Sequence, residues 1–216
     1  DLPAFLQPLA KHLAGIQFRT ADAAVLLGAI IVLHVMGLLD DRRPLGAYPK
    51  LFVMLGVSLA VVMLTDSRLL MLLDPHVGGS WLSIVITVLW IGVVTNAFNF
   101  LDNMDGLSGG VAAIAASFFL VATLVSGQWF IAACLSLLIG ALLGFLWFNF
   151  PLRRPATIFM GDGGSLVVGF LMAFLTVRTT YFGETPEAMA SGIGGAGGGG
   201  GWYGVFMPVV VLAVPL

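Results

Sequence analysis

The sequence predicts an all-α, polytopic bundle of transmembrane helices. Of its 216 residues, 59% are hydrophobic and only 9% are charged, and the mean hydropathy is +1.06. These values are typical of an integral membrane protein rather than a soluble domain. No segment alternates like a barrel strand, and backbone groups in lipid must be satisfied internally, so we expect helical spans. The length fits a single transmembrane helical bundle over residues 1–216, without a separate soluble domain.

Six apolar stretches are each long enough to cross the roughly 30 Å hydrocarbon layer of a bilayer. They cover residues 21–39, 47–65, 81–99, 107–125, 129–150 and 164–182, and a seventh begins near Trp202, which gives about seven spans. Residues 1–20 combine prolines with basic side chains, so we expect an interfacial or loop segment there. The glycine-rich stretch 191–201 is typical of a flexible linker or a poorly defined loop.

The connections between these spans divide into two groups when the crossings are counted. Those at 40–46, 100–106 and 151–163 share one membrane face, and those at 66–80, 126–128 and 183–201 share the other. The first face receives or borders most of the notable charged side chains, namely Asp40, Asp41, Lys50, Asp102, Asp105 and Asp162. Independent loops have no reason to converge in this way, so the pattern predicts one polar site on that face.

The central polar segment, residues 96–110, follows a hydrophobic span. Its carboxamides and carboxylates are Asn96, Asn99, Asp102, Asn103 and Asp105. Such groups near lipid are costly and by default mark a functional site. At about 100° per residue the three asparagines share one helix face. Gly106 permits a turn that would bring Asp105 back to that face. The alternative is a polar helix end capped by Asn and Asp.

Two more polar clusters flank other spans. Asp40 and Asp41 close the first span, and Lys50 opens the next. Paired carboxylates can hold a divalent cation or activate a nucleophile, and a lysine can meet phosphate oxygens. Asp162 precedes a later span, whose first turn we expect to offer free backbone N–H groups to an anion. The alternatives are solvated helix ends and an Asp N-cap.

Taken together, these groups suit a Mg²⁺-bound pyrophosphate, because Mg²⁺ prefers one or two protein oxygens together with water and substrate phosphates. Other polar residues have simpler interpretations. We expect His34 to be a buried, hydrogen-bonded histidine within its span, and Cys134 to be a packing residue. The basic residues are scattered, which argues against a nucleic-acid partner.

The three clusters resemble the signatures of a known superfamily, the polyprenyl-phosphate N-acetylhexosamine-1-phosphate transferases. The matching motifs are Asp40-Asp41 with Lys50, Asn96-x-x-Asn-x-x-Asp-x-x-Asp-Gly-Leu107, and Phe159-Met-Gly-Asp-x-Gly-Ser165. The superfamily includes the phospho-MurNAc-pentapeptide translocase of peptidoglycan synthesis and the UDP-GlcNAc transferases that start O-antigen, teichoic acid and N-glycan lipids. The resemblance runs from Asp40 to Ser165 in the same order and spacing.

The resemblance implies a role for each matching residue. Asn99 and Asp162 would contact Mg²⁺, with Mn²⁺ as an alternative ion. Asp40, paired with Asp41, would deprotonate or position the lipid phosphate, and Lys50 would bind phosphate. The substrate-binding residues would also include Asn96 and Asp102, which support the site, and a uridine-binding group formed by Asp105, Gly106, Leu107 and Phe159.

The implied reaction moves N-acetylhexosamine 1-phosphate from a UDP-sugar to polyprenyl (undecaprenyl) phosphate and releases UMP. The family implies about ten helices, of which residues 1–216 would be the middle part, in a bacterial inner membrane with the site facing the cytoplasm. The resemblance is also compatible with a homodimer. The chain departs from the family at Asn103, where glycine is usual, and lacks its histidine-rich loop motif.

Three features bear on the alternatives. Arg42, in place of a third aspartate, favours a UDP-GlcNAc transferase over the peptidoglycan enzyme. An ion-coupled transporter would place its carboxylates near the membrane midplane, often within inverted repeats, whereas here they lie at span ends. A CDP-alcohol phosphotransferase would continue Asp-Gly differently from the Leu107-Ser-Gly found here.

Overall fold

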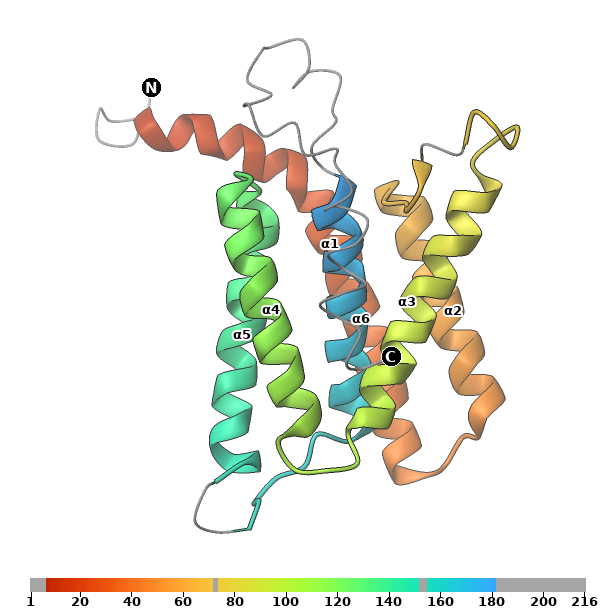
Figure 1. The fold of residues 1–216 in the computed structure, drawn as a ribbon, viewed down its shortest axis with the longest axis vertical. Coiled ribbons are helices and arrows are strands. Elements are labelled where there is room, and N and C mark those ends of the chain that lie inside the picture. The colour runs from red at the N-terminus through yellow and green to blue at the C-terminus, as the bar shows by residue number, and fades with distance from the viewer. Residues whose placement is uncertain (1–6, 72–73, 152–154, 182–216) are drawn as a thin grey trace.

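A computed structural model describes residues 7–71, 74–151 and 155–181 of the chain. These residues form the helices α1 (Gln7–Arg42), α2 (Ala47–Thr65), α3 (Trp81–Leu101), α4 (Leu107–Val125), α5 (Trp129–Asn149) and α6 (Gly161–Tyr181) (Figure 1). Each contains a segment long and apolar enough to cross a membrane. No strand occurs in the described residues, so the predicted all-α membrane bundle is confirmed. The predicted seventh span and the stretch 191–201 lie outside them.

The largest difference from the prediction is at the start of the chain. Residues 7–19 continue α1, where we expected an interfacial or loop segment. Pro8 lies in the first helical turn, where a missing backbone N–H interrupts no helical hydrogen bond, so it does not prevent the helix. The apolar span within α1 is Thr20–Arg42, close to the predicted 21–39. The earlier part runs across one end of the bundle before the helix turns along it (Figure 1).

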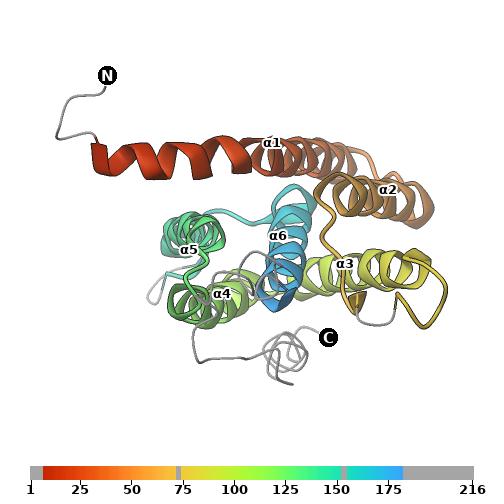
Figure 2. The ribbon, with the colours of Figure 1, turned by 90° about the horizontal axis from the view of Figure 1, so that it is seen from above.

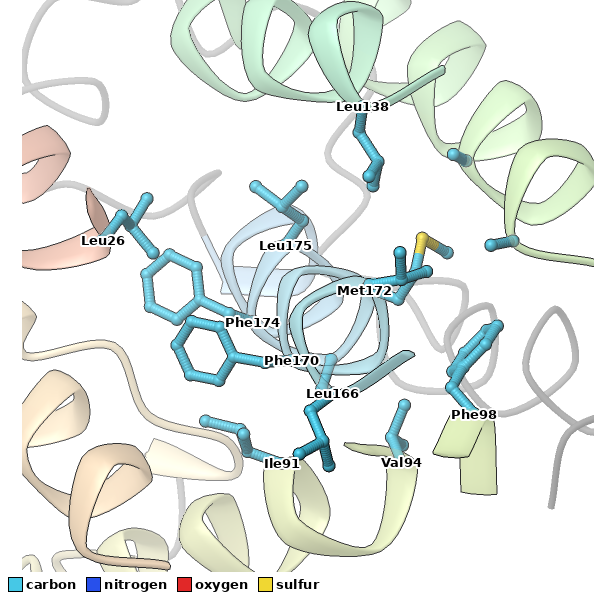
Figure 3. Close-up of a cluster of buried hydrophobic side chains, with 14 of the residues drawn as sticks. Leu26, Ile91, Val94, Phe98, Leu138, Leu166, Phe170, Met172, Phe174 and Leu175 are labelled. Carbon is cyan, nitrogen blue, oxygen red and sulfur yellow. The ribbon is translucent and has the colours of Figure 1, made fainter. Parts of the chain in front are cut away.

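Helix α6 lies at the centre of the bundle, between α1, α3 and α4 (Figure 2). It is the least apolar of the spans, with a mean hydropathy of 1.2, yet 72% of its apolar window is buried. Phe170 and Phe174 stack with ring centroids 6.2 Å apart in this core (Figure 3). Small residues allow such close packing in lipid. A Cβ atom on Gly169 would lie 2.9 Å from the Thr95 carbonyl oxygen.

Two polar networks fasten the ends of the helices. At one end, the buried Asn149 side chain accepts a hydrogen bond from the Gly106 N–H at 2.7 Å and donates one to the Ile158 carbonyl at 2.9 Å. At the other end, the Arg178 guanidinium pairs with Asp22 at 2.8 Å. Asn149 therefore joins the α3–α4 connection, which follows Asn96 and Asn99, to the α5–α6 connection, which precedes Asp162.

The connections α1–α2, α3–α4 and α5–α6 lie at one end of the bundle, and α2–α3 and α4–α5 lie at the other (Figure 1). This arrangement is the predicted one. We expect single cysteines at Arg43 and Asn103, in a Cys134→Ser background, to react with an impermeant maleimide from one side of the membrane. Cysteines at Ser80 and Gln128 should react from the other side. Mixed labelling within either pair would contradict this topology.

Candidate active site

The Asp162 carboxylate, at the start of α6, is the centre of a polar cluster. It forms an ion pair with the Lys50 ammonium and accepts a hydrogen bond from Asn99 Nδ2 at 2.7 Å. Lys50 Nζ also lies 3.3 Å from Asp40 Oδ2. These contacts join α1, α2, α3 and α6. The structure thus brings together residues from all three predicted clusters, and we call Asp40, Lys50, Asn99 and Asp162 the central cluster.

Three members of the central cluster, Asn99, Asp40 and Lys50, are further positioned by the fold. Asn99 Nδ2 also donates to Ser165 Oγ at 2.8 Å, and Ser165 is fully buried one turn into α6. Asp40 Oδ1 accepts the Leu45 N–H at 2.7 Å, which closes the turn between α1 and α2. Lys50 lies in the first turn of α2, where the helix fixes its direction. The polar atoms are therefore positioned by the fold rather than free at a loop tip.

The start of α6 is already occupied by carboxylates. Asp41 accepts hydrogen bonds from the Asp162 N–H at 2.9 Å and the Gly163 N–H at 3.1 Å. The Asp102 carboxylate accepts one from the Gly161 N–H. Our expectation of free N–H groups for a substrate anion is therefore wrong for these three residues. The cause is the partial positive charge at a helix N-terminus, which attracts the protein's own carboxylates as readily as a ligand.

Asp102 lies in the connection between α3 and α4, near other carboxylates. The pKa of its carboxyl group is raised to about 6, mainly by burial and further by the negative charges of Asp162, Asp41 and Asp105, against the lowering effect of the Gly161 N–H. Three other carboxylates therefore lie close enough to Asp102 to raise the pKa of its carboxyl group. Lys50 is the cation that forms ion pairs within the central cluster. Such an excess of carboxylates favours a bound cation.

The donor set can be compared with the needs of a divalent ion. Asp162 and Asn99 are within hydrogen-bond distance of each other, so their oxygens could reach one ion. The described residues contain no group of three or more His, Cys, Asp or Glu side chains arranged to hold a metal. An ion held here would therefore draw its other ligands from water and substrate. That pattern fits Mg²⁺, which keeps several waters and binds one or two protein oxygens.

Asn96 lies apart from the central cluster, in the wall of an apolar groove between α2 and α3. Its Nδ2 donates to the Gly92 carbonyl at 3.1 Å and lies 3.7 Å from Met54 Sδ. The groove has a volume of about 750 Å³ and is otherwise lined by apolar side chains and Gly92. Ala47 and Leu51, on either side of Lys50 in sequence, belong to its lining. The groove therefore begins beside the central cluster and continues into the membrane-spanning part.

The predicted uridine-binding residues do not join the central cluster. The Asp105 side chain is exposed and makes no hydrogen bond or ion pair with the described residues. Phe159 is 79% exposed. Gly106 has φ +76°, which suits glycine, and its backbone packs against the Phe150 ring. Leu107 begins α4. Asp105 and Phe159 are thus exposed, Gly106 and Leu107 are half-buried, and the uridine-binding role of these residues remains a prediction.

Some residues that shape the site were not assigned a role from the sequence. Asn149 joins two of the loops, and its only signal is that it stands alone among aromatic residues at the end of an apolar span. His34 was expected to be buried and hydrogen-bonded. It is hydrogen-bonded, with Nδ1 2.9 Å from the Gly163 carbonyl, but its side chain is exposed.

Sequence comparison shows which known proteins this chain is similar to. Residues 23–180 match the model of the family described as "Glycosyl transferase family 4". A Bacillus subtilis (strain 168) protein named "Probable undecaprenyl-phosphate N-acetylglucosaminyl 1-phosphate transferase" is 33% identical over 219 residues, covering 100% of this chain and 56% of the relative.

Two further relatives carry related names. The Escherichia coli (strain K12) undecaprenyl-phosphate alpha-N-acetylglucosaminyl 1-phosphate transferase is 27% identical, covering 76% of this chain and 46% of its own length. A Clostridium botulinum (strain Alaska E43 / Type E3) phospho-N-acetylmuramoyl-pentapeptide-transferase is 31% identical, covering 73% and 52%. The chain spans about half the length of the curated relatives it matches. With most of its length, including all three polar clusters, inside the matched region, the chain belongs to glycosyl transferase family 4.

Proposed function

We propose that this chain carries the active site of a membrane transferase that moves N-acetylhexosamine 1-phosphate from a UDP-sugar to polyprenyl phosphate and releases UMP. The carrying observation is that Asp40, Lys50, Asn99 and Asp162 meet at one end of the bundle, beside an apolar groove. A phosphate on an isoprenoid chain needs this combination of a charged site and an apolar channel. We place the site at the cytoplasmic face of the bacterial inner membrane, where UDP-sugars are available.

The acceptor lipid fits the groove between α2 and α3. Its apolar tail would lie along the side chains of Leu51, Leu55 and Val93. Its phosphate would then lie at the groove's polar end, within reach of the Lys50 ammonium, which binds phosphate oxygens as a compact charge. Asp40, 3.3 Å from Lys50 Nζ, is placed to orient that phosphate or to take its proton. Lys50 and Asp40 are therefore the proposed acceptor-phosphate residues.

The donor pyrophosphate would lie against Asp162 and Asn99. A divalent ion held by these two residues would supply positive charge to the phosphate oxygens, which is the usual contribution of a metal to phosphoryl transfer. An oxygen of polyprenyl phosphate forms a bond to the β-phosphorus of the UDP-sugar. The bond between that phosphorus and the bridging oxygen breaks, and the electron pair leaves with UMP. The chain's own residues act here mainly by positioning the two phosphates.

The donor sugar is assigned by similarity and by one residue. The relatives named above include two N-acetylglucosaminyl and one N-acetylmuramoyl-pentapeptide transferase. Arg42 follows the aspartate pair, which favours UDP-GlcNAc. The test is UMP release by the full-length protein with polyprenyl phosphate, Mg²⁺ and a panel of UDP-sugars. We expect UDP-GlcNAc to be used best. Preference for UDP-MurNAc-pentapeptide would move the chain to the other branch, and no release with any donor would overturn the proposal.

We propose that Asp105, Gly106, Leu107 and Phe159 recognise uridine. Asp105 would accept a hydrogen bond from the uracil ring N–H, and Phe159 would cover the base. Asp105→Ala should therefore weaken UDP-sugar binding by roughly 5- to 150-fold, since leaving one polar group unpaired costs on the order of 1 to 3 kcal/mol. The KM for polyprenyl phosphate should hardly change. An equal rise in both KM values would show a general structural role instead.

A further inference from the structure

Helix α1 contacts the first turn of α6 directly at the backbone. We propose that one face of α1, formed by His34, Gly37 and Asp41, is a positioning element that fixes the Asp162 carboxylate by holding the peptide groups around it. The inference rests on the proposed function, because it assumes that Asp162 is the residue whose placement matters for metal and pyrophosphate. It adds His34 and Gly37, which no motif of the site includes.

Side chains of α1 form hydrogen bonds with both the N–H and the carbonyl group of Gly163. Asp41 accepts the N–H groups of Asp162 and Gly163 at 2.9 and 3.1 Å. His34 Nδ1 lies 2.9 Å from the Gly163 carbonyl oxygen, to which it donates as the Nδ1–H tautomer. His34 and Asp41 are two helical turns apart on α1 and so project from the same face. The backbone on both sides of Asp162's Cα–C bond is thus tied to one helix.

Gly37 lies between these two residues on the same face and sets the distance between the helices. A Cβ atom there would lie 2.5 Å from the carbonyl carbon and oxygen of Asp162 and from Gly163 Cα. No side chain fits in that space, and the atoms in contact are backbone atoms that cannot rotate away. A Cβ atom on Gly163 would in turn lie 3.1 Å from the Leu38 side chain. Any added atom at Gly37 must therefore displace the residue that carries the central carboxylate.

Packing alone does not account for His34. Its side chain is exposed on a membrane-spanning helix, where a polar ring is costly and an aliphatic residue would pack equally well. Its ring is hydrogen-bonded to the carbonyl of Gly163, the residue next to Asp162. Groups that orient a metal ligand from behind typically change metal affinity by roughly 10- to 100-fold when removed. This is the effect we expect from His34 and Gly37, although neither contacts substrate.

The test compares four variants of the full-length protein. His34→Leu removes the donor, and His34→Asn keeps one, since the Asn amide nitrogen and His Nδ1 are both attached to Cγ. Gly37→Ala inserts the clashing methyl group. Gly28→Ala is the matched control, a glycine of the same helix whose Cβ would have no atom within 4 Å. Two quantities are measured: the Mg²⁺ concentration that gives half of the maximal thermal stabilisation, and the kcat and KM values of UMP release.

We call the Mg²⁺ concentration that gives half of the maximal thermal stabilisation the Mg²⁺ midpoint. We expect His34→Leu and Gly37→Ala to raise this midpoint by roughly 10-fold and to lower kcat, with the KM for polyprenyl phosphate unchanged. His34→Asn should recover most of the loss, and Gly28→Ala should match the parent. If Gly37→Ala does not fold, the two His34 variants still decide. A Mg²⁺ midpoint for His34→Leu equal to that of the parent, or His34→Asn as impaired as His34→Leu, would overturn the inference.

The two readouts separate this inference from the proposed function. Thermal stabilisation by Mg²⁺ requires no turnover, so it compares the His34 variants even if every UDP-sugar tested is inert. A parent protein that is stabilised by Mg²⁺ but releases no UMP would overturn the transferase and leave the positioning role supported or refuted by the midpoints. A parent that shows neither stabilisation nor UMP release would overturn both.

Discussion

Asp162→Asn is expected to reduce UMP release by about 10³-fold, which corresponds to a loss of about 4 kcal/mol of transition-state stabilisation. The substitution keeps the size of the side chain but removes its charge. The Asp162 carboxylate currently accepts from Lys50 and Asn99, and a carboxamide would present a second donor to one of them. The initial rate of UMP release at saturating UDP-sugar, over a range of Mg²⁺ concentrations, measures the effect.

The matched control is Asp66→Asn at the opposite end of the bundle. Asp66 is 78% exposed and has φ +48°, a conformation that asparagine adopts readily. The Asp66→Asn substitution should leave the rate of UMP release unchanged. Thermal unfolding of both variants shows whether the fold is intact. Full activity of Asp162→Asn at limiting Mg²⁺ would rule out this residue as the metal ligand.

Lys50→Ala is expected to lower kcat/KM by roughly 10²- to 10³-fold for every UDP-sugar alike, the range seen when one preorganised donor to a developing charge is removed. The loss should be uniform because Lys50 is assigned to the acceptor phosphate, which is the same whichever UDP-sugar is used. Lys50→Arg should restore little, since the planar guanidinium is larger than the compact ammonium between Asp40 and Asp162. Steady-state kinetics with at least two UDP-sugars measures this.

Arg43→Ala is the control for Lys50, because it removes a positive charge at the same end of the bundle from a side chain exposed outside the central cluster. It should change kcat/KM only slightly, and that change should fall with added salt. A Lys50→Ala loss confined to one sugar, or an equal loss in Arg43→Ala, would contradict a phosphate-binding role for Lys50.

The fold was largely predictable because hydrophobic length decides where helices cross a membrane. The predicted bounds of the six apolar spans agree with those found to within three residues. Their order could also be used to place the loops, which is why Lys50 and Asp162, 112 residues apart in sequence, could be predicted to share a face. Hydropathy failed to identify the centre of the bundle. In lipid the most apolar helices face outward, and α6, the least apolar span, is the most buried.

The site was predictable as a set of residues but not as a set of contacts. The sequence placed Asp41 beside Asp40 in one acidic pair, whereas the structure sends Asp40 to Lys50 and Asp41 to the backbone of α6. Neighbouring residues on a helix point about 100° apart, so a pair in sequence need not act as a pair in space. Asn149 was not found because a single buried carboxamide has no spacing to detect.

The most direct measurement follows the β-phosphate of the donor. The full-length protein is incubated with polyprenyl phosphate, Mg²⁺ and UDP-GlcNAc labelled with ³²P in the β-phosphate, and the lipid and nucleotide products are separated. In the proposed reaction the acceptor phosphate attacks the β-phosphorus. The label should therefore move to the lipid, with unlabelled UMP as the nucleotide product. Label that stays in the nucleotide as UDP would mean that the sugar alone is transferred, and it would contradict the assignment of Lys50, Asn99 and Asp162 to sugar-1-phosphate transfer.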